Sequence, residues 1–115
     1  EMKEGIEKIG KGAFSNCPSL QEIILPTSVK EIEECAFSMC DSLTRVEMKE
    51  GIEKIGTQAF VYCGHLEELT IPQSVKEIGD LCLMETGVKA ITVSPDCQLG
   101  DIFGADRDRA VISYY

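Results

Sequence analysis

The sequence offers one histidine, six cysteines and a short acidic run as its candidates for chemistry. His65 lies between Gly64 and Leu66, and there is no second histidine in the chain. Catalysis by a serine or cysteine nucleophile needs a base that a further group orients, and no such set is evident here. We therefore interpret His65 as an exposed polar residue, and we expect no catalytic residues and no enzyme activity.

Three of the cysteines, Cys17, Cys40 and Cys63, recur at intervals of 23 residues, each three positions after a phenylalanine. A zinc site would need paired cysteines or nearby histidines, which the sequence lacks. We interpret the three as a buried column of small apolar thiols and expect them to be free, although strand spacing would allow a disulfide by Cα distance. The sequence leaves Cys35, Cys82 and Cys97 unassigned.

The acidic run "GADRDR", at Gly104 to Arg109, has the closely spaced carboxylates of a calcium loop. Arg107 and Arg109 occupy the intervening positions, where their positive charges would neutralise the site. A solvated turn fits this stretch better. We therefore expect neither a metal nor another cofactor.

Length and composition indicate one soluble, folded domain. The chain has 115 residues, of which 43% are hydrophobic and 27% charged. No apolar stretch is long enough to span a bilayer, so we expect no membrane insertion. The net charge is −9 and the basic residues are interleaved with acidic ones, which argues against a nucleic-acid partner. The chain lacks an initiator methionine and starts inside a repeated motif, which favours a piece of a longer protein.

An internal repeat sets the organisation. We divide the chain into four rows: residues 1–23, 24–46, 47–69 and 70–91, with the last strand running to residue 93. Apolar residues form columns down the rows, and each of the first three rows carries an "AFxxC" block. The columns include Met2/Leu25/Met48/Ile71, Ile9/Ile32/Ile55/Ile78 and Ile23/Val46/Leu69/Ile91. Stacked rows that bury such columns against one another form a solenoid.

Short β-strands fit the rows better than helices. β-Branched residues crowd segments such as "EIILP" and "AITVS", and Pro26 and Pro72 interrupt any helix. We predict strands near Ile23–Leu25, Val46–Met48, Leu69–Ile71 and Ile91–Val93, and a second extended piece in each row near Val29–Ile32. The "AFxxC" block is predicted to form a tight or single helical turn. The predicted architecture is a right-handed, β-rich solenoid with parallel, in-register strands and short helical or 3-10 turns.

Charges alternate in sign from row to row. One column is Glu7/Lys30/Glu53/Lys76 and its neighbour is Lys8/Glu31/Lys54/Glu77. Strands that stack in register lie about 4.7–4.9 Å apart, so each charge would face an opposite charge in the next row. Like charges at that spacing would be destabilising. We therefore expect these residues to serve the stack rather than a ligand.

The repeat resembles the BspA-like leucine-rich repeats, a family of bacterial surface-type repeats of about 23 residues. The stretches "LQEIILPTSVKEIEECAFSMC" (Leu20 to Cys40) and "LEELTIPQSVKEIGDLCLMET" (Leu66 to Thr86) carry the resemblance. Rows one and three depart from the pattern, with "MKEG" at the turn. The resemblance implies a leucine-rich-repeat solenoid in a secreted or cell-surface protein. It also implies binding to other proteins, or adhesion to host matrix and cells, without catalytic residues.

The two ends of the array are predicted to differ. Residues 94–115 break the repeat and are interpreted as a C-terminal cap, with a strand near Ala110 to Tyr115. No cap precedes the first row. An open N-terminal end favours truncation from a longer array or self-association through that end.

A binding surface is expected where strand residues point outward, because these positions vary between rows while the core columns do not. The predicted protein-binding face comprises Glu22, Ile24, Arg45, Glu47, Glu68 and Thr70. The expected partner is a protein, such as a host extracellular-matrix or cell-surface protein. The alternative function is an architectural spacer within a larger surface protein, without a ligand of its own.

Overall fold

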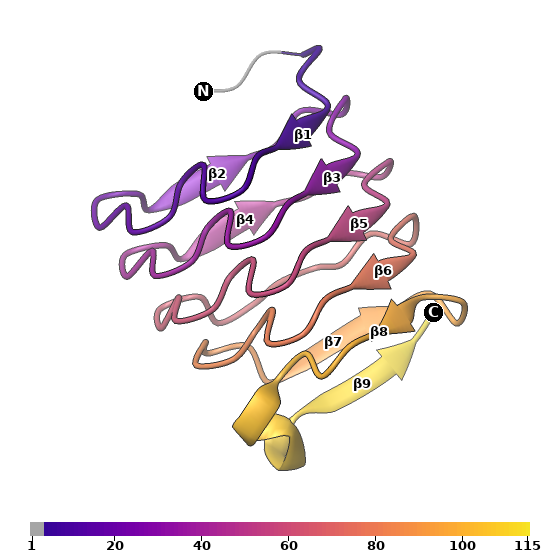
Figure 1. Ribbon diagram of the computed structural model, residues 1–115. Coiled ribbons are helices and arrows are strands. Elements are labelled where there is room, and N and C mark those ends of the chain that lie inside the picture. The colour runs from indigo at the N-terminus through magenta and orange to yellow at the C-terminus, as the bar shows by residue number, and fades with distance from the viewer. Residues whose placement is uncertain (1–3) are drawn as a thin grey trace.

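The structure, a computed structural model, describes residues 4–115, except for the side chains of Asp106 and Arg109. The predicted positions of Glu1 and Met2 in the strand columns lie outside the described residues. Each row of the repeat forms one turn of a solenoid, and the turns stack from the N-terminal to the C-terminal end (Figure 1).

A five-stranded parallel sheet, here called the ladder sheet, runs along one side of the stack (Figure 1). Its strands are β1 (Lys8–Ile9), β3 (Glu31–Ile32), β5 (Lys54–Ile55), β6 (Glu77–Ile78) and β8 (Gln98–Leu99). The isoleucines of the first four strands are buried and pair with one another in register, because alternate residues of a strand face opposite sides. The predicted parallel, in-register stack is confirmed.

Backbones of successive rows come into close contact just after two strands of the ladder sheet, β5 and β6. A Cβ atom on Gly56 would lie 2.8 Å from the backbone of Glu33 and Glu34 in the preceding row. At Gly79 the corresponding distance to the backbone nitrogen of Thr57 would be 2.5 Å. Only glycine fits at these places, which explains why the motif "EKIG" or "KEIG" ends as it does.

The other strands lie on a second side of the solenoid: β2 (Glu22–Ile24), β4 (Arg45–Glu47), β7 (Ala90–Val93) and β9 (Val111–Tyr114). They form two separate parallel pairs, β2 with β4 and β7 with β9. Residues 67–71, where the third row passes into the fourth, lie between the pairs in the order of the stack. We use the term strand face for the outward side chains of these four strands and of residues 67–71.

The predicted strand at Leu69–Ile71 is wrong, because residues 67–71 have no regular secondary structure. No backbone hydrogen bond joins residues 67–70 to β4 or to β7. The fourth row is one residue shorter than the others, and its Gly87 N–H donates to the Leu66 carbonyl at 2.7 Å, ahead of the strand position. Leu69 and Ile71 are nevertheless buried, so side-chain packing holds the segment without strand pairing.

The "AFxxC" blocks bind successive rows through the core. The rings of Phe14 and Phe37 stack with centroids 5.2 Å apart, and those of Phe37 and Phe60 at 5.3 Å. The thiol of Cys40 donates to the Phe14 carbonyl at 3.1 Å, and the thiol of Cys63 donates to the Phe37 carbonyl at 3.0 Å. The predicted interior stack of phenylalanines is confirmed, with Phe14 only half-buried in the first row.

Alternating turn sequences join the first row to the second. The hydroxyl of Ser28 accepts a hydrogen bond from the Gly5 N–H at 2.9 Å and donates to the Ile6 carbonyl at 2.7 Å. The carboxylate of Glu4 accepts hydrogen bonds from the N–H and hydroxyl of Thr27. The same serine contact joins the third row to the fourth. The "MKEG" turns that depart from the family pattern therefore form bonds with the serine-bearing turns that follow them.

The C-terminal segment builds a fifth turn. β8 extends the ladder sheet and β9 pairs with β7, with a 3-10 helix, η1 (Gly104–Arg109), between them (Figure 1). Ile102 and Phe103 are buried, whereas every residue of β9 is exposed. Across residues 4–115, no helix has the length and apolar character needed to cross a membrane.

Candidate protein-binding surface

Two paired strands, β2 and β4, bring four of the six predicted face residues together. β2 and β4 pair so that Glu22 lies beside Arg45 and Ile24 beside Glu47. The strand pattern places Ile23 and Val46 in the core, which leaves their neighbours pointing outward. Ile24 is 45% exposed and is the one apolar side chain among the six predicted face residues.

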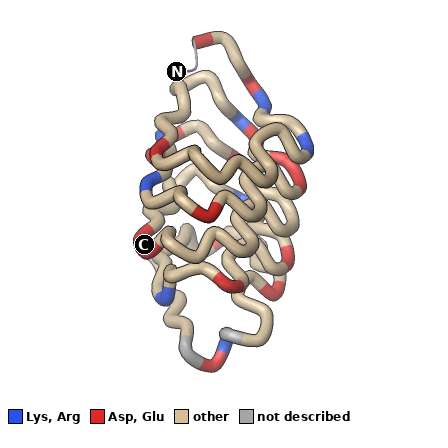
Figure 2. Tube along the Cα trace, turned by 90° about the vertical axis from the view of Figure 1, so that its left-hand side faces the viewer, with Lys and Arg blue, Asp and Glu red and all other residues tan. Residues whose placement is uncertain are grey.

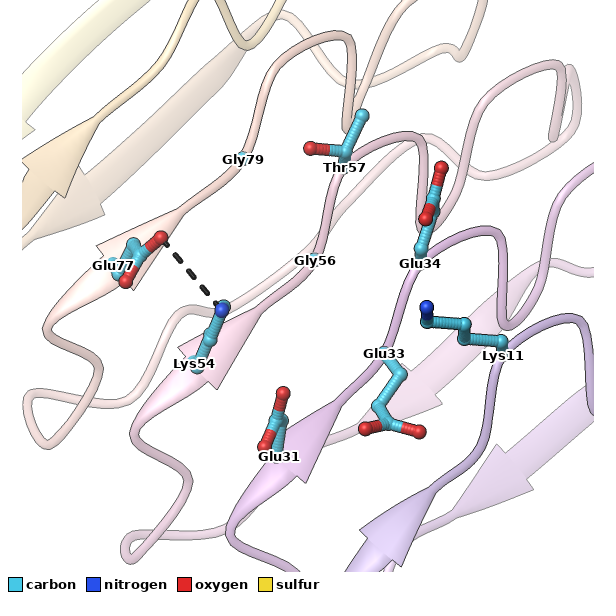
Figure 3. A pocket seen from close by; sticks show the side chains of 9 residues that line it. All are labelled: Lys11, Glu31, Glu33, Glu34, Lys54, Gly56, Thr57, Glu77 and Gly79. Carbon is cyan, nitrogen blue, oxygen red and sulfur yellow. Dashed lines mark ion pairs between the residues drawn. The ribbon is translucent and has the colours of Figure 1, made fainter.

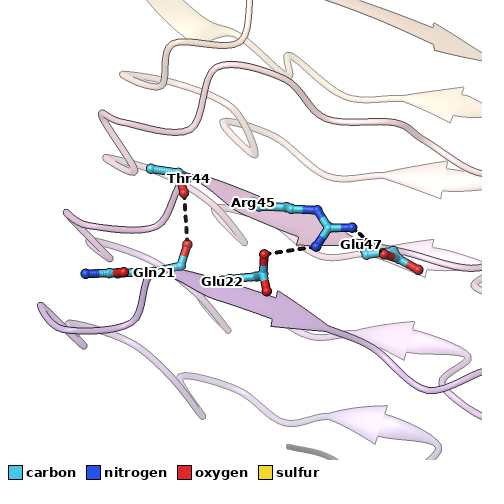
Figure 4. Close-up of polar contacts among 5 residues, drawn as sticks. All are labelled: Gln21, Glu22, Thr44, Arg45 and Glu47. Atoms are coloured by element: carbon cyan, nitrogen blue, oxygen red, sulfur yellow. Dashed lines mark hydrogen bonds and ion pairs between the residues drawn. The ribbon is translucent and has the colours of Figure 1, made fainter.

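Arg45 is at the centre of this part of the strand face. Its Nη1 donates to Glu22 Oε2 at 2.9 Å and its Nη2 donates to Glu47 Oε1 at 2.7 Å (Figure 4). The hydrogen bond and charge of Glu22 raise the pKa of Arg45 above its already high ordinary value. One guanidinium thus bridges two carboxylates, and the three side chains together carry a net negative charge.

The remaining two predicted residues, Glu68 and Thr70, are exposed where the third row passes into the fourth, and they belong to no strand. They line a groove of about 510 Å³ between residues 67–70 and β4. The structure therefore places all six predicted residues on the strand face, in two groups that differ in backbone pairing.

Charge over the molecule is dispersed. Acidic and basic residues are interspersed along the stack, and acidic residues predominate (Figure 2). Phosphate binding needs a basic patch, and the basic residues here are separated by acidic ones (Figure 2).

A second groove, of about 200 Å³, lies on the ladder sheet (Figure 3). Its lining is polar and includes Lys11, Glu31, Glu33, Lys54 and Glu77. In Figure 3, Lys54 and Glu77 point toward one another, with their charged atoms 3.9 Å apart. The charge columns predicted from sequence supply three of the nine lining residues, Glu31, Lys54 and Glu77. These three side chains lie in register on neighbouring strands, which gives them a structural role in the stack.

Only some neighbouring charges in the two charge columns form ion pairs. Lys8 and Glu31 form an ion pair at 3.8 Å, and Lys54 and Glu77 form another, but no ion pair joins Glu31 to Lys54. In the neighbouring column, Lys76 pairs with Asp96 of the fifth turn at 3.3 Å. The register behind the prediction is correct, whereas an ion pair on every rung is not observed.

The histidine and the cysteines, which are the residue types suited to catalysis or metal binding, do not form a reactive site in the described residues. His65 is exposed, and its Nδ1 lies 2.6 Å from the Asp41 carbonyl oxygen. All six cysteines are free thiols. Burial raises the pKa of Cys63 and of Cys82 to about 12, which suppresses the thiolate form that nucleophilic attack or metal binding requires. Within the described residues, no group of three or more histidine, cysteine or acidic side chains could hold a metal ion.

Sequence reasoning missed exposed apolar side chains outside the predicted face. Met39 and Tyr62 occupy equivalent turn positions in consecutive rows and are 45% and 48% exposed. Both have a positive φ, near 60°, which turns the side chain away from the core. The sequence contained part of this signal, because this column changes from Asn16 to Met39 to Tyr62 to Glu85, whereas a core column such as Ile9/Ile32/Ile55/Ile78 stays apolar.

A sequence model of one protein family matches residues 1–101, and its description is "BspA type Leucine rich repeat region (6 copies)". This family and its fold are typically non-enzymatic and suggest a protein-interaction or repeat module. No curated protein matches the chain.

Several solved structures resemble the chain. A leucine-rich repeat protein from Bacteroides capillosus is 30% identical, with a TM-score of 0.70 over 77% of this chain and 64% of that one. Leucine-rich repeat proteins from T. pallidum and Bacteroides ovatus are each 23% identical, with TM-scores of 0.58 and 0.54. The matches to those two cover 96% and 98% of this chain, and 69% and 44% of theirs. At such identity they support the fold alone, and the chain spans less than two thirds of the B. capillosus protein.

Proposed function

Because the chain belongs to the BspA-type leucine-rich repeat family, we propose that it is an adhesion or protein-binding segment of a secreted or cell-surface protein. The partner is a protein, such as a host extracellular-matrix or cell-surface protein. It binds the strand face around Glu22, Ile24, Arg45, Glu47, Glu68 and Thr70.

One observation carries this proposal: the strand face presents exposed residues that the core does not need. Ile24 is exposed beside an ordered cluster in which Arg45 bridges Glu22 and Glu47. An apolar side chain within a rigid, polar surround is the arrangement that protein-binding hot spots favour. None of the six residues is aromatic, so we expect weak contacts for each copy and stronger binding by an array of copies.

The test measures binding of the 115-residue chain, alone and as a tandem array, to immobilised extracellular-matrix proteins. Arg45→Glu should weaken binding, because it replaces the bridging cation with a third carboxylate. Lys11→Glu is the matched control, since Lys11 is exposed, lies away from the strand face, and makes the same change in net charge. Equal effects of the two substitutions would move the partner away from the strand face.

The spacer function has its own support. Arg45 is fully engaged by two intramolecular carboxylates, as expected of a charge that stabilises the stack. A tandem array that binds none of the matrix proteins, while remaining folded and monodisperse, would favour the spacer. Sedimentation velocity on the same samples tests self-association through the N-terminal end.

We also propose that residues 94–115 act as the C-terminal cap of the four rows. Their burial of Ile102 and Phe103 against the fourth row supports this role. A Phe103→Ala variant should lower the unfolding temperature, and an unchanged unfolding temperature would contradict the cap.

A further inference from the structure

On the strand face, fewer hydrogen bonds and ion pairs join β4 to residues 67–71, a contact here called the junction, than join β2 to β4 or β7 to β9. At the position of the serine that joins the other row pairs, the third row has Gly51, which has no hydroxyl. No ion pair among the described residues joins β4 to residues 67–71, and β4 has no strand partner on that side. The phenylalanine stack and the ladder sheet still join the second and third rows behind it.

The groove of about 510 Å³ lies over this junction. Its lining includes side chains from both sides of the junction: Thr44, Arg45, His65, Glu67, Glu68 and Thr70. All six are exposed, so the groove is open to a partner without any rearrangement.

The wall of the groove formed by residues 67–70 contains backbone carbonyl groups that accept no hydrogen bond from the neighbouring strands. Residues 67–70 make no backbone hydrogen bond to either neighbouring strand. Their carbonyl oxygens are therefore available as acceptors beside the carboxylates of Glu67 and Glu68. On the other side of these residues, the Tyr115 hydroxyl donates to the Ile71 carbonyl at 2.8 Å, which leaves the β4 side as the open one.

The negative charge of the groove favours a partner with a positively charged side chain. Glu67 and Glu68 form no ion pair with a described residue, whereas Arg45 on the opposite wall is already held by Glu22 and Glu47. The groove thus presents uncompensated negative charge together with free carbonyl acceptors. A guanidinium group carries five N–H donors and positive charge, and it matches such a set of acceptors.

We propose that this groove binds an arginine-bearing extended segment of a protein partner. A guanidinium from the segment pairs with Glu67 or Glu68 and donates to a free carbonyl oxygen of residues 67–70. This inference rests on the proposed function and adds the chemistry of the partner and the place where it binds.

The test uses the 115-residue chain and a labelled peptide, Thr-Arg-Thr-Arg-Thr, whose two arginines project to the same side in an extended conformation. The same peptide with citrulline in place of arginine is the control, because citrulline keeps the shape and loses the charge. Binding is followed by fluorescence anisotropy at low and moderate salt. Backbone amide shifts in NMR spectra locate the peptide, and we expect them at residues 44–47 and 67–70.

The variant Glu67→Gln/Glu68→Gln should weaken binding of the arginine peptide roughly tenfold, since it removes the unpaired carboxylates of the groove. The matched control is Glu34→Gln/Glu53→Gln, which makes the same change in net charge at exposed positions outside the groove. We expect less than about a twofold effect there, because charges beyond a Debye length are largely screened.

Three results would overturn the inference: equal losses in the two double variants, equal binding of the citrulline peptide, or amide shifts confined to another surface. Binding of a matrix protein that Glu67→Gln/Glu68→Gln leaves unchanged, but Arg45→Glu weakens, would reject this groove and keep the proposed function. Absence of binding to both the peptide and the matrix proteins would reject the two together.

Discussion

The hydroxyl of Ser74 accepts a hydrogen bond from the backbone N–H of Gly51, 23 residues earlier, at 2.9 Å. The same hydroxyl donates to the Ile52 carbonyl at 2.7 Å. Ser28 makes the equivalent contacts with the first row. Glycine and serine therefore alternate in this column for a structural reason: the turn of one row supplies the donor and the turn of the next supplies the acceptor. This turn contact consequently recurs every 46 residues, while backbone hydrogen bonds join every row to the next.

Ser74→Ala should lower the free energy of unfolding by about 1–2 kcal/mol, because it leaves a partly buried N–H and a carbonyl without their partner. Urea denaturation followed by circular dichroism measures the change. Ser42→Ala is the control, since the hydroxyl of Ser42 is half-buried and makes no hydrogen bond with a described residue. Equal destabilisation by both variants would show that the Ser74 contact adds nothing specific.

Lys54→Glu should lower the free energy of unfolding by about 0.5–1.5 kcal/mol at low salt. It breaks the ion pair with Glu77 and places three carboxylates in register, at positions 31, 54 and 77. Part of the loss should return as salt rises, because these side chains are about half exposed and their repulsion is screened.

Lys30→Glu is the comparison for this effect. From sequence alone it should be equally harmful, because Lys30 lies between Glu7 and Glu53. In the structure Lys30 makes no ion pair with a described residue, so we expect a smaller loss than for Lys54→Glu. Urea titrations of both variants at two salt concentrations decide the order, and a larger loss for Lys30→Glu would show that the Lys54–Glu77 ion pair does not set it.

Stability should fall steeply between about pH 9 and pH 12 under reducing conditions. Burial raises the pKa of Cys63 and Cys82 from 9.0 to about 12, so in this range the unfolded chain releases protons that the folded chain keeps. Each thiol then lowers the free energy of unfolding by up to about 1.4 kcal/mol per pH unit, while below pH 9 its contribution is constant.

Cys63→Val isolates this contribution from the lysines and tyrosines that titrate in the same range. Urea midpoints measured from pH 8 to pH 11 should fall less steeply for the variant than for the unmodified chain, whatever the offset between the two at pH 8. Parallel curves would mean that the Cys63 thiol ionises as easily in the folded chain as in the unfolded one.

The sequence by itself determined the architecture and the residues of the strand face. Residues that recur every 23 positions must lie in equivalent places, and burial of the Ile9/Ile32/Ile55/Ile78 column allows only one register. Outward residues follow from the same alternation, which is why Glu22, Arg45 and Glu47 could be named before their ion pairs were seen.

Only the tertiary structure decided which neighbouring groups actually bond. Pairing between strands of two or three residues depends on small differences in how rows of unequal length lie on one another, and apolar columns do not encode these differences. Thus Lys54 pairs with Glu77 but not with Glu31, although both face it in register. Residues 67–70 likewise remain without a strand partner, because the packing of Leu69 holds them in place and the shorter fourth row makes its contact at Gly87 instead.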